Sequence, residues 1–379
     1  MNFALTDDQA MIRDAAAGFL ADASNSAAVR RAMASAEGFD VAVWQRIGGE
    51  LGWCGVAIDE AHGGMGLGPV ELVLIQEQAG RRLLCAPFYS SVCVGAPLLQ
   101  ELATDAAQAK YLPRIAAGTL RTAVPTYGAI EEWVAEASHL HARAVGKGWV
   151  LEGELHYLMD GASADLLLVY GKLDDGGLGL FAVPRTARGV VVTSLKTWDP
   201  TRRFADVKFA GVTAGERIDD PARVDAGVLR MASLARLYLA AEQLGGAQQC
   251  LDMTVEYTAG RKQFGRPVAG FQAVKHRCAQ MMVQVESLRS AVYGAAALAA
   301  GAVDTEALAL ECAMAKAMAS EAFFFCAQEA IQLHGGVGFT WEYDPHLYFK
   351  RAQASSHWLG TAEQLRERMA QLLLDSPAA

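Results

Sequence analysis

The feature that most constrains the fold of this chain is a strand-like block between two helical regions. Residues 1–118 are rich in Ala, Leu, Arg and Gln, with apolar side chains at helical spacing, and residues 223–379 return to longer patterns of that kind. Residues 119–222 hold short apolar runs such as Leu166–Tyr170 and Leu178–Val183, separated by Gly, Asp and Pro. This order predicts an α+β, mainly α protein with an N-terminal helical domain, a middle β domain and a C-terminal helical domain.

Two local signals predict where elements begin and turn. Thr6 and Gln9 fit a capping box, which predicts a helix start there. The segment Gly146-Lys147-Gly148 separates an alternating run that begins at Leu140 from an apolar run that begins at Trp149. We therefore expect a β-hairpin in the middle block.

Charge and composition exclude several classes of protein. A formal net charge of −9 argues against a nucleic-acid surface, which needs clustered Lys and Arg. No apolar run reaches the roughly eighteen residues of a membrane-spanning helix, so we expect no membrane span. The seven cysteines have no paired short spacing, and no group of His, Cys and Asp has metal-ligand spacing. We therefore expect a cytoplasmic protein with free thiols and no metal site.

Three motifs in the last third of the chain point to a specific chemistry. Arg261–Pro267 reads R-K-Q-F-G-R-P, Phe271–His276 reads F-Q-A-V-K-H, and Gln332–Phe339 reads Q-L-H-G-G-V-G-F. A guanidinium can hold two oxygens of a pyrophosphate, and adjacent glycines let a backbone approach a cofactor closely. These motifs resemble the signatures of the acyl-CoA dehydrogenase family. Shorter matches occur in the same order along the chain: LTDDQAMIRD near the N-terminus, Thr197–Arg202 and Gly360–Arg368.

The resemblance implies a fold, a reaction and a set of site residues. The family fold ends in a four-helix bundle, and its enzymes use FAD to introduce an α,β double bond into an acyl-CoA thioester, passing electrons to a soluble electron-transfer flavoprotein. Family members share each FAD at a subunit interface. The resemblance implies that these residues contact the cofactor: Arg261, Gln263, Phe264, Phe271, Gln272, Gln332, Gly335, Gly336 and Thr361.

The sequence departs from the family where the catalytic base should stand. The family reaction removes a proton from the α carbon of the substrate, so a carboxylate must lie within reach of that proton. Its commonest position, the Glu of a Y-E-G-T segment, holds Leu359 here, and the alternative position on an earlier helix holds Ala235. Neither side chain can accept a proton, so the resemblance implies no catalytic residue at the usual positions.

The segments that wrap a subunit's own flavin in the family also differ. The family loop T-E-P-G-A-G-S-D is expected near Val124, where this chain reads V-P-T-Y-G-A-I. The W-I-T segment, whose Thr meets flavin N5, becomes Tyr157-Leu158-Met159, and a thioether offers no hydrogen-bond donor. The contacts to a neighbour's FAD are therefore present in the sequence, whereas the contacts to the chain's own FAD are lost.

Three hypotheses follow. In the first, the chain is the non-catalytic, beta-type subunit of a bacterial heteromeric (α2β2) acyl-CoA dehydrogenase, of the kind that acts in steroid side-chain breakdown, and holds the FAD of a catalytic partner. In the second, it is a self-sufficient homo-oligomer with an unusual base, and Glu242, two helical turns after Ala235, is the candidate. In the third, the fold serves another flavin chemistry or a structural role, for which Asp199 and Glu342 are available acids.

Overall fold

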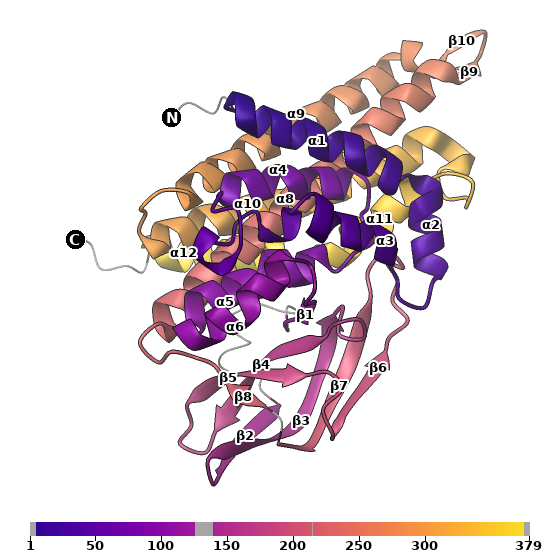
Figure 1. Cartoon of the computed structure of the whole chain (residues 1–379). Coiled ribbons are helices and arrows are strands. Elements are labelled where there is room, and N and C mark those ends of the chain that lie inside the picture. Colours follow the sequence, from indigo (N-terminus) through magenta and orange to yellow (C-terminus); the bar gives the residue numbers. More distant parts are fainter. Residues whose placement is uncertain (1–4, 126–138, 214, 375–379) are drawn as a thin grey trace.

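The computed structural model describes residues 5–125, 139–213 and 215–374. A layer of helices from both ends of the chain packs above a single sheet (Figure 1). The N-terminal helices alternate with short 3₁₀ and π-helical turns. These helices are α1 (Asp7–Ala23), α2 (Ser26–Ala34), α3 (Val41–Gln45), α4 (Pro69–Arg81), α5 (Ala96–Leu102) and α6 (Asp105–Ala116).

The predicted capping box at the start of α1 is confirmed. The Thr6 hydroxyl accepts from the Gln9 backbone N–H at 3.2 Å, and the Gln9 side chain accepts from the Thr6 N–H at 3.1 Å. Both bonds satisfy donors that the first helical turn leaves free. Buried Ala16 and Leu20 then place one face of α1 against the core.

The middle block folds into one mostly antiparallel sheet whose described strands run in the order β6-β7-β3-β2-β4-β5-β8, with β1 pairing β4. The predicted hairpin is confirmed, because β2 and β3 meet at the pair Val145 and Gly148, and Gly146 takes a φ of 62° that suits glycine. The strands are β1 (Thr122–Ala123), β2 (Leu140–Val145), β3 (Gly148–Met159), β4 (Leu166–Leu173), β5 (Leu178–Pro184), β6 (Val190–Ser194), β7 (Phe204–Val212) and β8 (Glu216–Arg217).

Long helices form the C-terminal bundle. Its helices are α8 (Val224–Gly260), α9 (Gln272–Ala299), α10 (Thr305–His334), α11 (Pro345–Ser355) and α12 (Ala362–Leu374). A small hairpin of β9 (Lys262–Gln263) and β10 (Arg266–Pro267) joins α8 to α9 and projects beyond the rest of the molecule (Figure 1). Because α8 also packs on α4 and α5, one hydrophobic core runs through both helical regions.

The predicted three-part, mainly helical architecture is confirmed. The expected boundaries at 118/119 and 222/223 fall between α6 and β1 and between β8 and α8, and as domain limits they stay predictions. None of the helices in the described part of the chain combines the length and the apolar composition that a bilayer crossing requires. All seven cysteines are free thiols.

Candidate functional site

The fold brings together the two positions where a base would be expected. Arg236, the neighbour of Ala235 in α8, donates from Nε to the Leu359 carbonyl oxygen at 3.1 Å. Ala235 and Leu359 are both fully buried in the same core. The two positions therefore lie in one region of the interior, and each contributes only hydrocarbon to it.

A buried lysine lies beside the Leu359 segment. Lys316 of α10 donates from Nζ to Ser320 Oγ at 2.7 Å and to the Gly360 carbonyl at 3.5 Å. Burial lowers the pKa of Lys316 to about 7, and the nearby charge of Arg236 adds to this shift. This lysine was not singled out from the sequence, because nothing in the α10 pattern distinguishes it from a surface lysine.

The residues expected around the chain's own flavin do not fit that cofactor. Met159 is fully buried in the main core, together with Val124 and Trp358. The Trp358 ring packs on Phe204 at 5.5 Å between centroids. Met159 and Val124 fill this interior with apolar atoms and provide no hydrogen-bond donor for a flavin ring, so among these three side chains only the Trp358 indole N–H is a donor. Most of the altered loop that begins near Val124 lies at residues 126–138, outside the described residues.

Glu242, the candidate base of the second hypothesis, is the centre of a buried ion-pair network. Arg351 of α11 donates from Nη1 to its Oε1 at 2.6 Å, Gln76 of α4 donates to its Oε2 at 2.7 Å, and Arg202 also pairs with Oε2. Burial alone raises the pKa of Glu242, but the two arginines outweigh burial and hold the pKa below its usual value. A carboxylate held in this way is a poor proton acceptor, so the structure argues against the role proposed for Glu242.

Asp199 belongs to the same network. It lies in a turn, where its Oδ1 accepts from the Thr201 backbone N–H at 2.9 Å, but its carboxylate is buried and Oδ2 accepts from Arg351 Nε at 2.7 Å. The network therefore ties the N-terminal helices, the sheet and the bundle together at one point. Glu342, in contrast, is exposed in the loop before α11.

The residues expected to reach a neighbour's FAD gather at one end of the bundle. Arg261, Gln263, Phe264, Phe271 and Gln272 lie on the hairpin tip between α8 and α9. Gln332, Gly335 and Gly336 end α10 at the same level, because Tyr257 near the end of α8 stacks on His334 with centroids 4.3 Å apart. A salt bridge of 3.5 Å between Arg277 of α9 and Glu329 of α10 completes the connection.

The surface of this tip is open. Phe264 is 92% exposed, and side chains placed at Gly335 or Gly336 would meet no atom within 4 Å. Although a Cβ would have room at Gly335, its φ of 65° is a conformation that favours glycine. An exposed aromatic ring, open glycine backbone and an exposed guanidinium at Arg261 form a surface that can contact a dinucleotide from outside the chain.

The tip lies far from the Leu359 region of the same chain. Lys316, which contacts Gly360, precedes Gln332 by sixteen positions on α10, a separation of about 24 Å at 1.5 Å per residue. Thr361 lies at the Leu359 end as well, where its hydroxyl caps α12 by accepting from the Gln364 N–H at 3.3 Å. The structure therefore groups the other residues predicted to bind FAD and places Thr361 apart from them.

Backbone strain marks several of these positions. Among the described residues, five that are not glycine have positive φ, and three of them were singled out from the sequence: Tyr157 at 55°, Phe264 at 52° and Leu359 at 61°. This conformation is costly for side chains with a Cβ and persists where the surroundings enforce it. The backbone at these sites keeps a positive φ even where the side chain has no reactive group.

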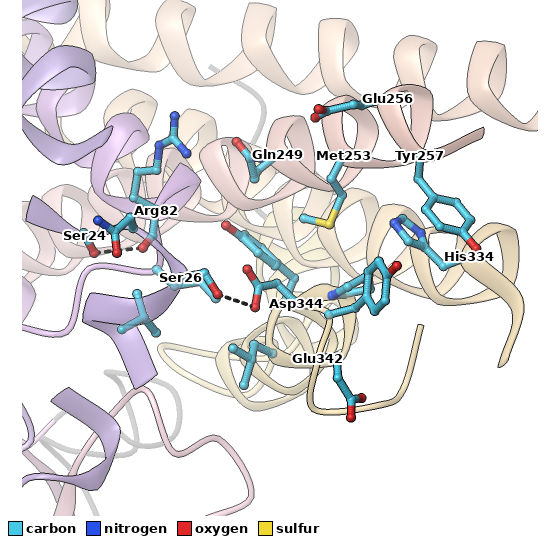
Figure 2. Close-up of a pocket in the computed structure, with 17 residues that line it drawn as sticks. Ser24, Ser26, Arg82, Gln249, Met253, Glu256, Tyr257, His334, Glu342 and Asp344 are labelled. Carbon is cyan, nitrogen blue, oxygen red and sulfur yellow. Dashed lines mark hydrogen bonds between the residues drawn. The ribbon is translucent and has the colours of Figure 1, made fainter. Parts of the chain in front are cut away.

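A cavity of about 540 Å³ lies next to the tip, between α8 and the loop before α11. Figure 2 shows Arg82 at one end and Tyr257, His334 and Glu256 at the other. His334 Nδ1 donates to the Ala330 carbonyl at 2.6 Å, and burial lowers the pKa of the ring. Glu342, an acid named for the third hypothesis, lines this cavity, whereas Ala235, Glu242 and Leu359 do not.

Comparisons with known proteins identify the family of the chain. The model of the acyl-CoA dehydrogenase N-terminal domain matches residues 6–119, and that of the C-terminal domain matches residues 228–374. The acyl-CoA dehydrogenase IpdE2 of Mycobacterium tuberculosis is 32% identical over 98% of this chain and 99% of its own length.

Two solved structures extend the likeness to the whole fold. The ChsE4-ChsE5 complex from Mycobacterium tuberculosis contains a chain with a TM-score of 0.88, 27% identity and 100% coverage of both chains. A variant of the Tcur3481-Tcur3483 steroid ACAD has a TM-score of 0.87 and 28% identity, covering 98% of this chain and 99% of its own. The chain described here belongs to the acyl-CoA dehydrogenase family.

Proposed function

We propose that this chain is the non-catalytic subunit of a heteromeric, FAD-dependent acyl-CoA dehydrogenase. One observation carries the proposal: the two parts of a flavin site lie far apart within this chain. The tip around Arg261 offers open contacts for a dinucleotide, whereas the region of Leu359, about 24 Å away along α10, is buried and holds no carboxylate at either usual base position. Because the tip lies too far from the interior of its own subunit to contact a cofactor there, it is suited to contact a cofactor bound to another subunit.

The chemistry of the holoenzyme divides accordingly between the two chains. Bound FAD supplies the hydride acceptor, and the partner supplies the carboxylate that removes the α proton. In this chain, Arg261 can hold a pyrophosphate through paired N–H donors, Gln272 and Gln332 can donate amide hydrogens, and Phe264 can cover a ring. The role of this chain is to bind and orient the cofactor.

The relatives support a proposal for the substrate class. The ChsE4-ChsE5 neighbour is a complex of two different chains, and the Tcur3481-Tcur3483 neighbour is described as a steroid ACAD. We infer a bulky, ring-bearing acyl-CoA as the substrate of the assembly, with electrons leaving to an electron-transfer flavoprotein. The competing homo-oligomer with Glu242 as base is less well supported, because both oxygens of that carboxylate are held by arginines.

Co-expression tests the proposal. The chain purified alone should lack the visible absorbance of a flavin and should not oxidise acyl-CoA, whereas the chain co-purified with a catalytic acyl-CoA dehydrogenase subunit should be yellow. Arg261→Ala should lower the flavin content of the heteromer, and Arg143→Ala, at an exposed arginine of β2, should not. An isolated chain saturated with flavin that turns over an acyl-CoA would refute the proposal.

A further inference from the structure

The hairpin tip has an unusual charge for this protein. Five of the 33 basic residues of the chain and none of its 42 acidic residues lie between Tyr257 and Val285. The basic residues are Arg261, Lys262, Arg266, Lys275 and Arg277. All of them are exposed, on a tip that projects from a protein whose overall charge is −9 (Figure 1). The tip is thus a concentrated positive patch on an otherwise acidic molecule.

Most of this charge has no partner within the described part of the chain. Arg277 pairs with Glu329, and the Arg266 guanidinium lies over the Phe271 ring at 3.9 Å. Arg261, Lys262 and Lys275 have no acidic partner among the described residues. The pyrophosphate of a bound dinucleotide brings only about two negative charges, one per phosphate. Arg261 is suited to those phosphates, which leaves Lys262 and Lys275 as exposed charges available to a partner surface.

An apolar strip adjoins the basic residues. Val255 of α8 and Met282 and Val283 of α9 are 46%, 57% and 63% exposed, which is high for apolar side chains. A cavity of about 460 Å³ lies between the two helices, and its lining is mostly apolar but includes the acids Asp252 and Glu256 of α8. An apolar centre with a charged rim is the usual composition of a protein–protein interface.

We infer that the α8–α9 tip docks on a partner chain whose surface around the bound cofactor is acidic, and that Lys262 and Lys275 select this partner by charge. The inference rests on the proposed function, because the cofactor-bearing partner is the catalytic subunit. Val255, Met282 and Val283 then form the buried centre of the contact, and the lysines form its rim. Rim charges of this kind govern association rate, salt dependence and partner choice more than the contact area does.

The test compares two double variants within the heteromer purified by co-expression. Lys262→Gln with Lys275→Gln removes the unpaired rim charges, and Lys147→Gln with Lys172→Gln removes two exposed lysines of the sheet as a matched control. The dissociation constant between the two subunits is measured in about 50 mM and about 500 mM NaCl, where screening lengths differ roughly threefold. Flavin per heteromer is measured in parallel from absorbance.

The tip variant should bind the catalytic subunit about tenfold more weakly than wild type at low salt, and the difference should shrink to less than about twofold at high salt. The control variant should match wild type at both salt concentrations. A tip variant that matches wild type at both concentrations, in a heteromer that still holds flavin, would overturn the acidic-partner inference and leave the proposed function standing.

Two further outcomes would also overturn the inference. Self-association of the isolated chain that is weakened by the same lysine substitutions would assign the surface to a second copy of this chain. Saturation of the isolated chain with flavin would remove the proposed function and the inference with it, and this outcome is read from the spectrum independently of the affinity.

Discussion

Replacing Glu242 by glutamine removes the carboxylate that contacts both Arg202 and Arg351 in the buried network. The substitution keeps the size and shape of the side chain, so its main effect is electrostatic. Both arginines are almost fully buried, with 4% and 1% of their side chains exposed. In Glu242→Gln, Asp199 stays beside Arg351, and Arg202 keeps its bond to the Ala86 carbonyl at 3.2 Å and its place over the Tyr89 ring at 6.0 Å, but loses its ion pair with Glu242.

The expected loss is large because one partner of a buried ion pair is removed while the other stays. Such changes cost about 3–5 kcal/mol of stability, against about 0–1 kcal/mol for an exposed pair. The Glu242 pKa is lowered in the folded protein, so its stabilising effect is present at neutral pH and is lost as the pH falls through the folded-state pKa. The variant should therefore lose stability mainly at neutral pH.

Urea unfolding followed by circular dichroism measures this loss. Glu242→Gln should lower the free energy of unfolding by about 3–5 kcal/mol, and Glu321→Gln, which breaks an exposed pair with Arg366, should lower it by less than about 1 kcal/mol. Turnover per folded heteromer should be unchanged in both variants. Unchanged stability combined with lost turnover in Glu242→Gln would refute this reasoning and restore Glu242 as a catalytic base.

Two other substitutions test the Leu359 region. Lys316 has a folded-state pKa of about 7 against an ordinary 10.5, so the unfolded chain binds the extra proton and wild-type stability should rise between pH 7 and pH 10. Lys316→Met should flatten that rise and add roughly 2 kcal/mol at pH 7, as followed by thermal unfolding across the pH range. Leu359→Glu should give no acyl-CoA oxidation by the isolated chain and should cost roughly 1–3 kcal/mol of stability, because it replaces a fully buried apolar side chain by a carboxylate whose burial the neighbouring Lys316 and Arg236 offset only in part. Turnover by that single variant would mean that the chain's own flavin pocket is intact.

Local sequence signals predicted much of the fold. The capping box at Thr6 and the glycine turn at Gly146 act over a few residues, so their outcome depends little on the rest of the chain. The switch from helical to alternating apolar patterns likewise marked the sheet, because the period of burial follows directly from helix and strand geometry. The resemblance then identified the bundle.

The tertiary contacts of the site could not be predicted in the same way. Glu242 meets Arg202 and Arg351 across 40 and 109 residues of sequence, and no periodic pattern encodes such a meeting. Glu242 therefore resembled a free helix carboxylate in sequence, although it is an internal counter-ion. The stacking of Tyr257 on His334 was missed for the same reason, although both residues lie within or close to the family motifs.

The most direct test of the central claim is the number of flavins bound by an intact heteromer, counted by native mass spectrometry. If this chain holds only its partner's cofactor, the heteromer should contain one FAD for each pair formed by this chain and a catalytic chain. Two FAD molecules for each such pair would mean that the interior around Leu359 and Met159 binds a flavin of its own, and would contradict the account.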